Sequence, residues 1–249
     1  MQVIKKHIVI VGATSGIAEQ CARIWIQEPA ITLTLVGRDK NKTQLLADDL
    51  AVRNPAAVIK VVTTDFLSPK EIAHTVESIC AAMPVSIALI AHGSLPDQQQ
   101  CQQDLELNQQ TLEVNGISPV LFAEAFATQM EKAQQGTLAL IGSVAGDRGR
   151  KSNYVYGAAK GLVTRYAQGL QHRFAKTPIK IVLIKPGPTA TAMTAHLPQR
   201  GLAAADAVAA TIVQGIAQGK PVIYAPAKWA VIMMIIIHLP AFVFNKLDI

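Results

Sequence analysis

The chain has 249 residues, of which 50% are hydrophobic and only 16% are charged, and its formal net charge is +6. This length suits one large domain with a sizeable core, and the composition excludes disordered and low-complexity chains. The basic residues are scattered and aromatic residues make up only 5%, so we expect no binding to nucleic acid. The three cysteines, Cys21, Cys80 and Cys101, lie far apart without metal-ligand spacing, which argues against a disulfide scaffold or a metal site.

Short β-branched runs alternate with longer helical patterns along most of the chain. Seven segments are typical of strands: His7–Val11, Ile31–Val36, Val58–Thr63, Val85–Ala91, Thr137–Gly142, Ile179–Ile184 and Val222–Tyr224. Six segments between them have the length and composition of helices: Ser15–Gln27, Asn41–Arg53, Pro69–Ala82, Asp104–Gln134, Tyr154–Ala175 and Ala204–Gln218. This alternation predicts an α/β fold with a doubly wound, Rossmann-type parallel sheet of seven strands and helices on both faces.

The first strand runs directly into the first helix through Gly12-Ala13-Thr14-Ser15-Gly16-Ile17. Small residues let the backbone of such a turn approach a pyrophosphate, whose charge is met by amide N–H groups and by the positive end of the helix dipole. We therefore expect this turn, residues 12–17, to bind a dinucleotide. A plain strand-to-helix turn is the alternative.

The second strand ends at Gly37-Arg38-Asp39. A guanidinium at this strand tip is suited to a 2′-phosphate, whereas a carboxylate would bind the ribose hydroxyl. Arg38 therefore favours NADP(H) over NAD(H), and Asp39 is the argument for NAD(H). After the third strand, Asp65 and Phe66 lie where a carboxylate can accept the adenine amino group, with capping of the next helix as the alternative role of Asp65.

Tyr156 and Lys160 lie four residues apart in a predicted helix, and Ser143 follows the preceding strand. Residues i and i+4 share one face of a helix, so the lysine is expected one turn above the tyrosine. A neighbouring ammonium lowers the pKa of a tyrosine from its ordinary value of about 10, which makes proton transfer feasible near neutral pH. Ser143 can donate a hydrogen bond to a substrate oxygen. Each of the three residues alone has a trivial explanation, but their combination at a strand end and on the following helix has few.

These residues resemble the short-chain dehydrogenase/reductase family, and the likeness runs from the first strand to about Thr194. The resemblance implies that Tyr156 is the general acid in reduction and the base in oxidation, and that Ser143 polarises the carbonyl. It also implies that Lys160 binds the nicotinamide ribose and that Asn115 holds a water linking Lys160 to solvent. The residues that it assigns to an NAD(P) cofactor are Gly12, Thr14, Ser15, Gly16, Ile17, Arg38, Asp65, Phe66, Ala91, His92, Gly93, Tyr156, Lys160, Pro186, Gly187, Thr189 and Thr191.

Two positions depart from the family pattern. Ala18 stands where a third glycine is usual, which is a small-for-small change. Ile90-Ala91-His92-Gly93 replaces the usual Asn-Asn-Ala-Gly, and this puts local stability and the adenine ribose contact in doubt rather than the chemistry. We expect His92 to be structural or to line the cofactor site, because the tyrosine already serves as the acid. By the same likeness, the segment after Met193 is expected to close over the substrate.

The C-terminal segment, residues 226–249, breaks the alternating pattern. It offers nine apolar residues from Trp229 to Ile237 before His238 interrupts them, whereas a membrane span needs about 20. We expect this segment to lie at a membrane interface, on a partner subunit or around an apolar substrate, with a buried core helix as the alternative. Residues 1–225 then form a single NAD(P)-binding domain.

The sequence therefore predicts an NADP(H)-dependent oxidoreductase that interconverts a carbonyl and a secondary alcohol on a hydrophobic or lipid-linked small molecule. The alternatives are a non-catalytic dinucleotide-binding regulator or scaffold, and an epimerase or dehydratase of the same family. The family's habit of pairing long helices, here Asp104–Gln134 and Tyr154–Ala175, implies a homodimer or homotetramer. The apolar run before Gly12 is too short for a signal peptide, so we expect a cytoplasmic protein with peripheral contact to the inner face of the membrane.

Overall fold

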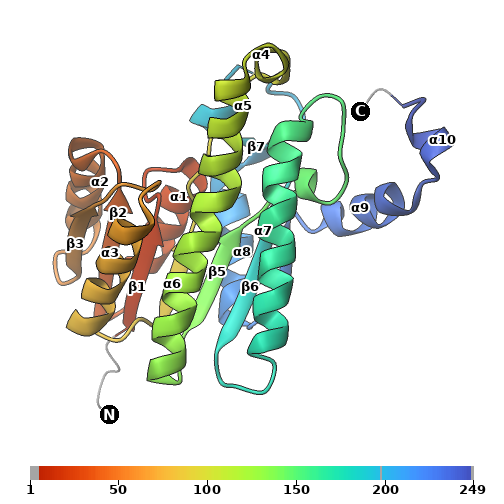
Figure 1. The fold of residues 1–249 in the computed structure, drawn as a ribbon. Coiled ribbons are helices and arrows are strands. Elements are labelled where there is room, and N and C mark those ends of the chain that lie inside the picture. The colour runs from red at the N-terminus through yellow and green to blue at the C-terminus, as the bar shows by residue number, and fades with distance from the viewer. Residues whose placement is uncertain (1–5, 197, 248–249) are drawn as a thin grey trace.

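The computed structural model describes residues 6–196 and 198–247, and its centre is a seven-stranded sheet in the order β3-β2-β1-β4-β5-β6-β9 (Figure 1). The strands are β1 (Lys6–Val11), β2 (Ile31–Gly37), β3 (Val58–Thr63), β4 (Ile87–Ile90), β5 (Thr137–Ile141), β6 (Lys180–Pro186) and β9 (Val222–Ala225). Every neighbouring pair is parallel, which confirms the predicted doubly wound fold. The order reverses between β1 and β4, whose carboxyl ends border the crevice where such folds bind ligands. Residues 1–5, on which the expectation of no signal peptide partly depends, lie outside the described residues.

The helices form a layer on each face of the sheet. Along β1, Ile8 and Ile10 belong to one hydrophobic cluster, and Val9 and Val11 belong to the other. Because alternate residues of a strand face opposite sides, a strand that is apolar at every position needs helices on both faces. One face is covered by α1 (Gly16–Trp25), α2 (Lys40–Arg53) and α8 (Ala205–Ala217), and the other by α3 (Pro69–Ala82), α6 (Ser118–Ala133) and α7 (Tyr154–Arg173) (Figure 1).

The long helix predicted over Asp104–Gln134 is interrupted. Helix α5 (Leu105–Leu112) leads into a π-helical turn, Glu113–Ile117, before α6 begins. Pro119 favours this irregularity, because it has no N–H to donate to the carbonyl of Asn115 one turn earlier. The π-helical turn contains Asn115, which is one of the predicted site residues.

Two short strands after β6 have no counterpart in the predicted pattern. β7 (Thr189–Ala190) and β8 (Ala203–Ala204) form a separate two-stranded parallel sheet. Segments of two residues are too short to show a strand period in the sequence.

Before α5, the glutamine-rich segment forms α4 (Gln98–Gln103), which Asp97 caps by accepting from the amide N–H of Gln100 at 3.0 Å.

Helices α9 (Lys228–His238) and α10 (Ala241–Phe244) project from the body of the molecule, and we call them the C-terminal arm (Figure 1). In α9, Met233 is buried, whereas Val231, Met234 and Ile235 are more than half exposed. The alternative of a buried core helix is therefore wrong. In the described part of the chain, no helix is long and apolar enough to cross a membrane.

Contacts at both ends of α9 hold the arm to the body. The guanidinium of Arg148 donates to the carbonyl oxygens of Ile236 at 2.5 Å and Leu239 at 2.6 Å, and it lies 3.8 Å from the centre of an aromatic ring of α10. Carbonyls at the end of a helix lack partners within it, and a cation is favoured there. At the other end of α9, Trp229 packs against Gly187 so closely that a Cβ at this glycine would overlap the indole ring.

Candidate active site

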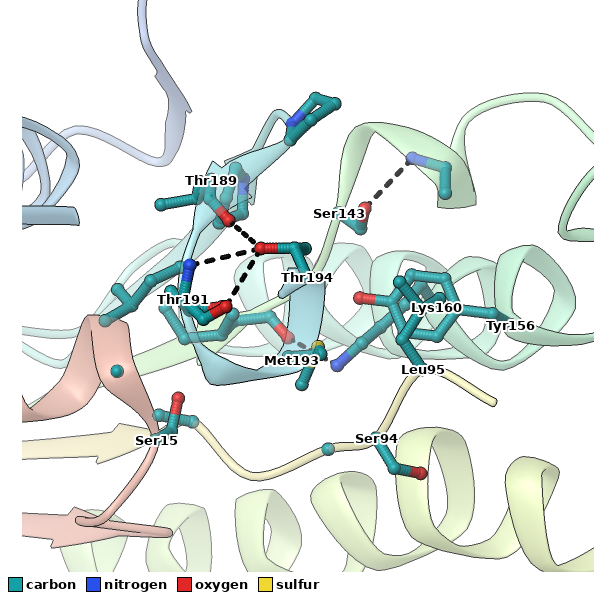
Figure 2. A pocket seen from close by; sticks show the side chains of 18 of the residues that line it. Ser15, Ser94, Leu95, Ser143, Tyr156, Lys160, Thr189, Thr191, Met193 and Thr194 are labelled. Atoms are coloured by element: carbon teal, nitrogen blue, oxygen red, sulfur yellow. Dashed lines mark hydrogen bonds between the residues drawn. The ribbon is translucent and has the colours of Figure 1, made fainter. Parts of the chain in front are cut away.

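A cavity of about 510 Å³ opens beside the carboxyl ends of β1, β4, β5 and β6, at the edge where the strand order reverses. In Figure 2, Tyr156 and Lys160 enter this cavity from α7, Ser143 from the segment after β5, and Ser15 from the turn after β1. The structure therefore brings the predicted catalytic and phosphate-binding residues to one place.

Lys160 lies one turn after Tyr156 on α7, and its Nζ is 5.8 Å from the centre of the tyrosine ring. The same ammonium donates a hydrogen bond of 3.0 Å to the carbonyl of Ile141, at the end of β5. Ser143 comes two residues later, and its Oγ accepts from the amide N–H of Ala145 at 3.1 Å. A hydroxyl that accepts one hydrogen bond still has its own proton to donate. The three side chains thus present two O–H donors and one cation to the cavity.

The pKa values of this pair differ from the sequence prediction. Burial raises the pKa of Tyr156 to about 12, and the hydrogen bond with Ser143 acts in the opposite direction. Burial also lowers the pKa of Lys160 to about 8. The predicted lowering of the tyrosine pKa is wrong, because the desolvation of the buried phenol dominates. At neutral pH the phenol carries its proton and the amine is charged.

Asn115 is fully buried in the π-helical turn and fixes one wall of the cavity from behind. Its Oδ1 accepts from the amide N–H of Ser94 at 2.8 Å, and its Nδ2 donates to the carbonyl of Thr111 at 2.9 Å. A Cβ on Gly93 would lie 2.7 Å from that Oδ1, so the close approach requires glycine. Gly93 and Ser94 line the cavity, and Asn115 positions them. The water-holding role of Asn115 stays a prediction.

The turn after β1 has the shape that a phosphate-binding turn needs. Gly12 has a φ of +76°, which favours glycine, and a Cβ there would lie 2.6 Å from the Cβ of His92. A Cβ on Gly16 would lie 3.0 Å from the Cγ2 of Thr191, so the turn also packs closely against the segment after β6. Its members that line the cavity, at the positive end of the α1 dipole, are Thr14, Ser15, Gly16 and Ile17.

A second cavity of about 220 Å³ continues from this turn toward α2. Four residues line both cavities: Thr14, Ser15, His92 and Gly93. The second cavity also contacts Arg38, Lys42 and Phe66, and the Arg38 guanidinium lies 5.9 Å from the centre of the Phe66 ring. Together the cavities extend from Arg38 past the turn to Tyr156. This elongated space, with cations at one end and the phenol at the other, fits a dinucleotide.

Two carboxylates predicted near the cofactor have local partners. Asp39 is the N-cap of α2, and its Oδ1 accepts from the amide N–H of Lys42 at 3.1 Å. Asp65 is exposed, and its carboxylate accepts from the amide N–H of Leu67 at 2.8 Å. It does not line either of these two cavities. Ser68, rather than Asp65, caps α3. Binding of adenine by Asp65 stays a prediction, and its contacts favour a role in the local turn.

His92 is buried between the two cavities and is neutral. Its Nε2 lies 2.8 Å from the Oγ of Ser118, and its ring makes an edge contact with Phe66 at 4.7 Å. Burial, with smaller effects from the charges of Lys160 and Arg38, lowers the pKa of His92 to about 3. Its buried Nδ1 has no hydrogen-bond partner in the described part of the chain. These contacts fit a structural or cofactor-lining residue and not a second acid.

The segment after β6 supplies another wall of the cavity. The side-chain oxygen of Thr194 donates to the carbonyl of Thr189 at 2.6 Å and accepts from the amide N–H of Thr191 at 3.1 Å (Figure 2). Met193 and Thr194 line the cavity, so the segment expected to close over the substrate starts inside it, whereas residue 197 lies outside the described residues. The predicted cofactor residues that also line this cavity are Ala91, Pro186, Gly187, Thr189 and Thr191.

Arg150 and Asn153 also line the cavity, and they are not among the predicted site residues. Both belong to the segment between β5 and α7, where no periodic pattern or known motif marks a position. The sequence carries one signal for Arg150, because two arginines, Arg148 and Arg150, lie between Ser143 and Tyr156. A concentration of positive charge beside catalytic residues indicates an anionic ligand.

Known proteins share this arrangement. The family model described as short chain dehydrogenase matches residues 6–201. An uncharacterized oxidoreductase of Mycobacterium tuberculosis is 31% identical over 246 residues, which cover 96% of this chain and 96% of the relative.

Solved structures are similar over nearly the whole chain. A short-chain dehydrogenase from Sphingobium yanoikuyae in complex with NADPH has a TM-score of 0.81 at 21% identity, covering 95% of this chain and 97% of that chain. The bulky-bulky ketone specific alcohol dehydrogenase from Comamonas testosteroni has a TM-score of 0.78 at 23% identity, covering 98% of this chain and 90% of that chain. From the family match and the related oxidoreductase, this chain belongs to the short-chain dehydrogenase family and is an NAD(P)-dependent oxidoreductase.

Proposed function

We propose that the protein is an NADP(H)-dependent oxidoreductase that interconverts a carbonyl and a secondary alcohol. The observation that carries this proposal is the convergence of Ser143, Tyr156 and Lys160 on a cavity that continues past the phosphate-binding turn to Arg38. A carbonyl oxygen that becomes a hydroxyl needs a proton donor, a second hydrogen-bond donor and a nearby positive charge. These three side chains offer one of each.

Tyr156 is the proton donor in reduction and the acceptor in oxidation. With its pKa raised to about 12, the phenol holds its proton at neutral pH, which is the form that reduction requires. The hydroxyl of Ser143 donates to the same carbonyl oxygen. Lys160, with a pKa of about 8, is charged at neutral pH and stabilises the negative charge that Tyr156 acquires when it gives up its proton. When bound, the nicotinamide cofactor supplies or accepts the hydride.

The preference for NADP(H) over NAD(H) rests on the second cavity. Arg38 and Lys42 both line it, together with Asp39, which lies 4.0 Å from the ammonium of Lys42, so the guanidinium of Arg38 is the main cation for a 2′-phosphate. The carboxylate of Asp39 accepts from an amide of α2, so it has a structural role besides any contact with ribose. The structural neighbour bound to NADPH supports the same preference.

A hydrophobic substrate is supported by the lining of the first cavity. Leu95, Val144 and Met193 surround the catalytic side chains with apolar groups. The structural neighbour from Comamonas testosteroni is described as specific for bulky-bulky ketones. We infer that this protein also accepts ketones with sizeable apolar substituents, including lipid-linked ones.

The C-terminal arm, outside the NAD(P)-binding domain of residues 1–225, is our candidate for peripheral membrane contact. Its exposed apolar side chains include Met234, Ile235 and Phe242, and Lys228 and Lys246 are near its ends. An apolar surface flanked by lysines suits the interface of an anionic bilayer.

A homodimer or homotetramer is supported by the surface that α6 and α7 form together. Arg173 of α7 pairs with Glu124 and Glu131 of α6 at 2.7 Å and 2.5 Å, which joins the two helices into one face. Leu162 of α7 is 42% exposed on this surface and is available to a second copy of the chain.

The experiment that tests the proposed function measures oxidation of NADPH and of NADH side by side over ketones of increasing chain length. We expect turnover with NADPH that rises with apolar chain length. Tyr156→Phe removes the proton donor and keeps the ring, so it should lower kcat by about 10²–10⁴-fold while NADPH still binds. Fluorescence titration with NADPH checks that the variant still binds the cofactor.

The alternatives give different results in the same experiment. A dinucleotide-binding regulator or scaffold would bind NADPH without consuming it, and Tyr156→Phe would change nothing. An epimerase or dehydratase would convert a hydroxylated substrate without net oxidation of the cofactor. Turnover of ketones that survives Tyr156→Phe would refute the assigned role of the tyrosine.

A further inference from the structure

The segment between β5 and α7 brings two polar groups without partners into the catalytic cavity. The Nε of Arg150 and the Oδ1 of Asn153 are both buried, and neither has a hydrogen-bond partner among the described residues. Leaving such a group unpaired is unfavourable, and more so when it is charged, so native proteins seldom do this without a functional reason. Both residues lie within six positions of Tyr156 in the sequence.

The positive charge and the hydrogen-bond donors of Arg150 have few partners in the protein around it. Its Nη2 contacts the sulfur of Met233 at 3.3 Å, and a thioether is a weak acceptor. The charge of Asp147 acts favourably on Arg150, but the Asp147 carboxylate is bound by Lys185 and by the hydroxyl of Tyr224. Within the described residues, no carboxylate makes a salt bridge to Arg150. Its guanidinium therefore keeps hydrogen-bond donors for a ligand.

Arg148, two residues earlier, shows the contrast. Its guanidinium donates to three carbonyl oxygens at the end of α9, those of Ile236, Ile237 and Leu239. The structural need for a cation in this segment is thus met by Arg148. Arg150 faces the cavity without a comparable set of acceptors.

Asn153 occupies the N-cap of α7 but does not cap the helix. The amide N–H of Val155, which an N-cap side chain often binds, donates instead to Oε1 of Gln98 in α4 at 3.1 Å. Gln98 has therefore taken the capping role. The Asn153 amide is left free to contact a ligand, and rotation of the amide turns its nitrogen, the donor that an anionic oxygen needs, to the place of this oxygen.

We propose that Arg150 and Asn153 form a subsite for an anionic oxygen group of the substrate, a carboxylate or a phosphate, next to the carbonyl held by Ser143 and Tyr156. This inference rests on the proposed function and deepens it. A planar guanidinium binds either oxyanion with two parallel hydrogen bonds, and a partly buried site strengthens them. The substrate class is then an apolar ketone or alcohol that carries one negative group near the reacting carbon.

The test compares matched ketones with the full-length enzyme and NADPH. Levulinate and longer oxo-alkanoates are each measured beside their methyl esters, and dihydroxyacetone phosphate is measured beside dihydroxyacetone. We expect kcat/KM for at least one anion to exceed that of its neutral partner by about tenfold or more, the size of one charge-assisted hydrogen bond. The pair that shows the larger preference separates a carboxylate substrate from a phosphate substrate.

Variants then assign the preference to Arg150. Arg150→Met removes the charge and keeps an apolar side chain, and it should bring the ratio of anion to neutral partner to about one, mainly by raising KM for the anion. Arg150→Lys keeps a positive charge and should retain part of the preference. The matched control is Arg53→Met on α2, whose guanidinium pairs with Asp49 on the surface, and it should keep the whole preference. Calorimetric titration of each anion into the enzyme with NADP⁺ gives a second readout that needs no turnover.

The outcomes separate this inference from the proposed function. If neutral ketones consume NADPH and the anions show no advantage, the subsite is refuted and the proposed function stands. If no ketone is turned over, the proposed function fails, and the calorimetric titration still tests the anion subsite. Binding of an anion that is lost in Arg150→Met supports the subsite, whereas no binding, or binding that Arg150→Met leaves intact, overturns it.

Discussion

The ammonium of Lys160 lies 5.8 Å from the centre of the Tyr156 ring and donates a 3.0 Å hydrogen bond to the carbonyl of Ile141. The amine is thus held between the end of β5 and the phenol. Because it is buried, its pKa falls to about 8, and that of Tyr156 rises to about 12. The two groups titrate far apart, so the lysine is the one whose charge changes closest to physiological pH.

The first prediction concerns the pH dependence of reduction. Below about pH 8 Lys160 is charged and Tyr156 is protonated, and as the pH rises through about 8 the lysine loses its charge first. We expect kcat for ketone reduction to fall above that pH. The measurement is a pH profile of kcat at saturating NADPH for the natural chain and for Lys160→Met. Lys160→Met should be slower at every pH and should lack the inflection, and an inflection that persists in it would assign the titration to another group.

The second prediction concerns acid stability. The folded-state pKa of His92, about 3, is below the ordinary value of 6.5, so between these pH values the unfolded chain binds a proton that the folded protein does not. The free energy of unfolding should therefore fall as the pH falls through this window, by at most about 1.4 kcal/mol per pH unit from His92. His92→Gln keeps a polar contact for Ser118 and should flatten the dependence. Urea denaturation at several pH values measures both slopes.

A control for this prediction is present in the chain. Burial also lowers the pKa of His7, whose Nε2 lies 2.8 Å from the hydroxyl of Thr34. His7 contributes a slope of the same sign in both proteins, so the difference between them isolates His92. Identical slopes in the two proteins would mean that His92 accepts a proton without unfolding.

The third prediction concerns cofactor choice. Arg38→Ala removes one of the two cations in the second cavity, and the ratio of kcat/KM for NADPH to that for NADH should fall by about 10–100-fold. Arg53→Ala removes a surface arginine at the C-terminal end of α2, the helix that follows Arg38, and should leave the ratio as it is. A ratio that Arg38→Ala does not change would remove the argument for NADP(H).

The fourth prediction concerns the C-terminal arm. Ile235 is 56% exposed on α9, and a charge there opposes insertion into a bilayer interface. We expect the protein to sediment with vesicles that contain anionic lipid, and Ile235→Asp to reduce the bound fraction several-fold. Val52→Asp on α2, where the valine is 82% exposed, places the same charge away from the arm and should have no effect. Equal sedimentation of Ile235→Asp and the natural chain would exclude the arm as the contact.

Much of the fold follows from the sequence because its signals are local. Three such signals lie within a few residues each: the apolar residues on both faces of β1, the glycines of the turn after β1, and the spacing of Tyr156 and Lys160. Such patterns require only the helix and strand periods to interpret. The seven-stranded parallel sheet is predicted for the same reason.

Other features depend on distant contacts that a sequence does not display. The pKa of Tyr156 is set mainly by how much of the molecule surrounds it, which the four-residue spacing to Lys160 does not convey. Arg150 lines the cavity while Arg148 binds the carbonyls of α9, and the amide N–H of Val155 next to Asn153 is bound by Gln98 of α4. Each of these assignments joins segments that are more than 50 residues apart, as the separations of 88 and 57 residues show.

Arg148 and Arg150 belong to one short loop, yet both contact the same distant helix. The first holds the end of α9 by its carbonyls, and the second meets the sulfur of Met233 in that helix while it lines the cavity. Arg150 therefore joins the lining of the cavity to α9, so a substitution of Arg150 alters a contact of that helix as well as the cavity. An environment-sensitive dye attached at position 242, where Phe242 is 71% exposed, tests whether filling the cavity changes the surroundings of the arm.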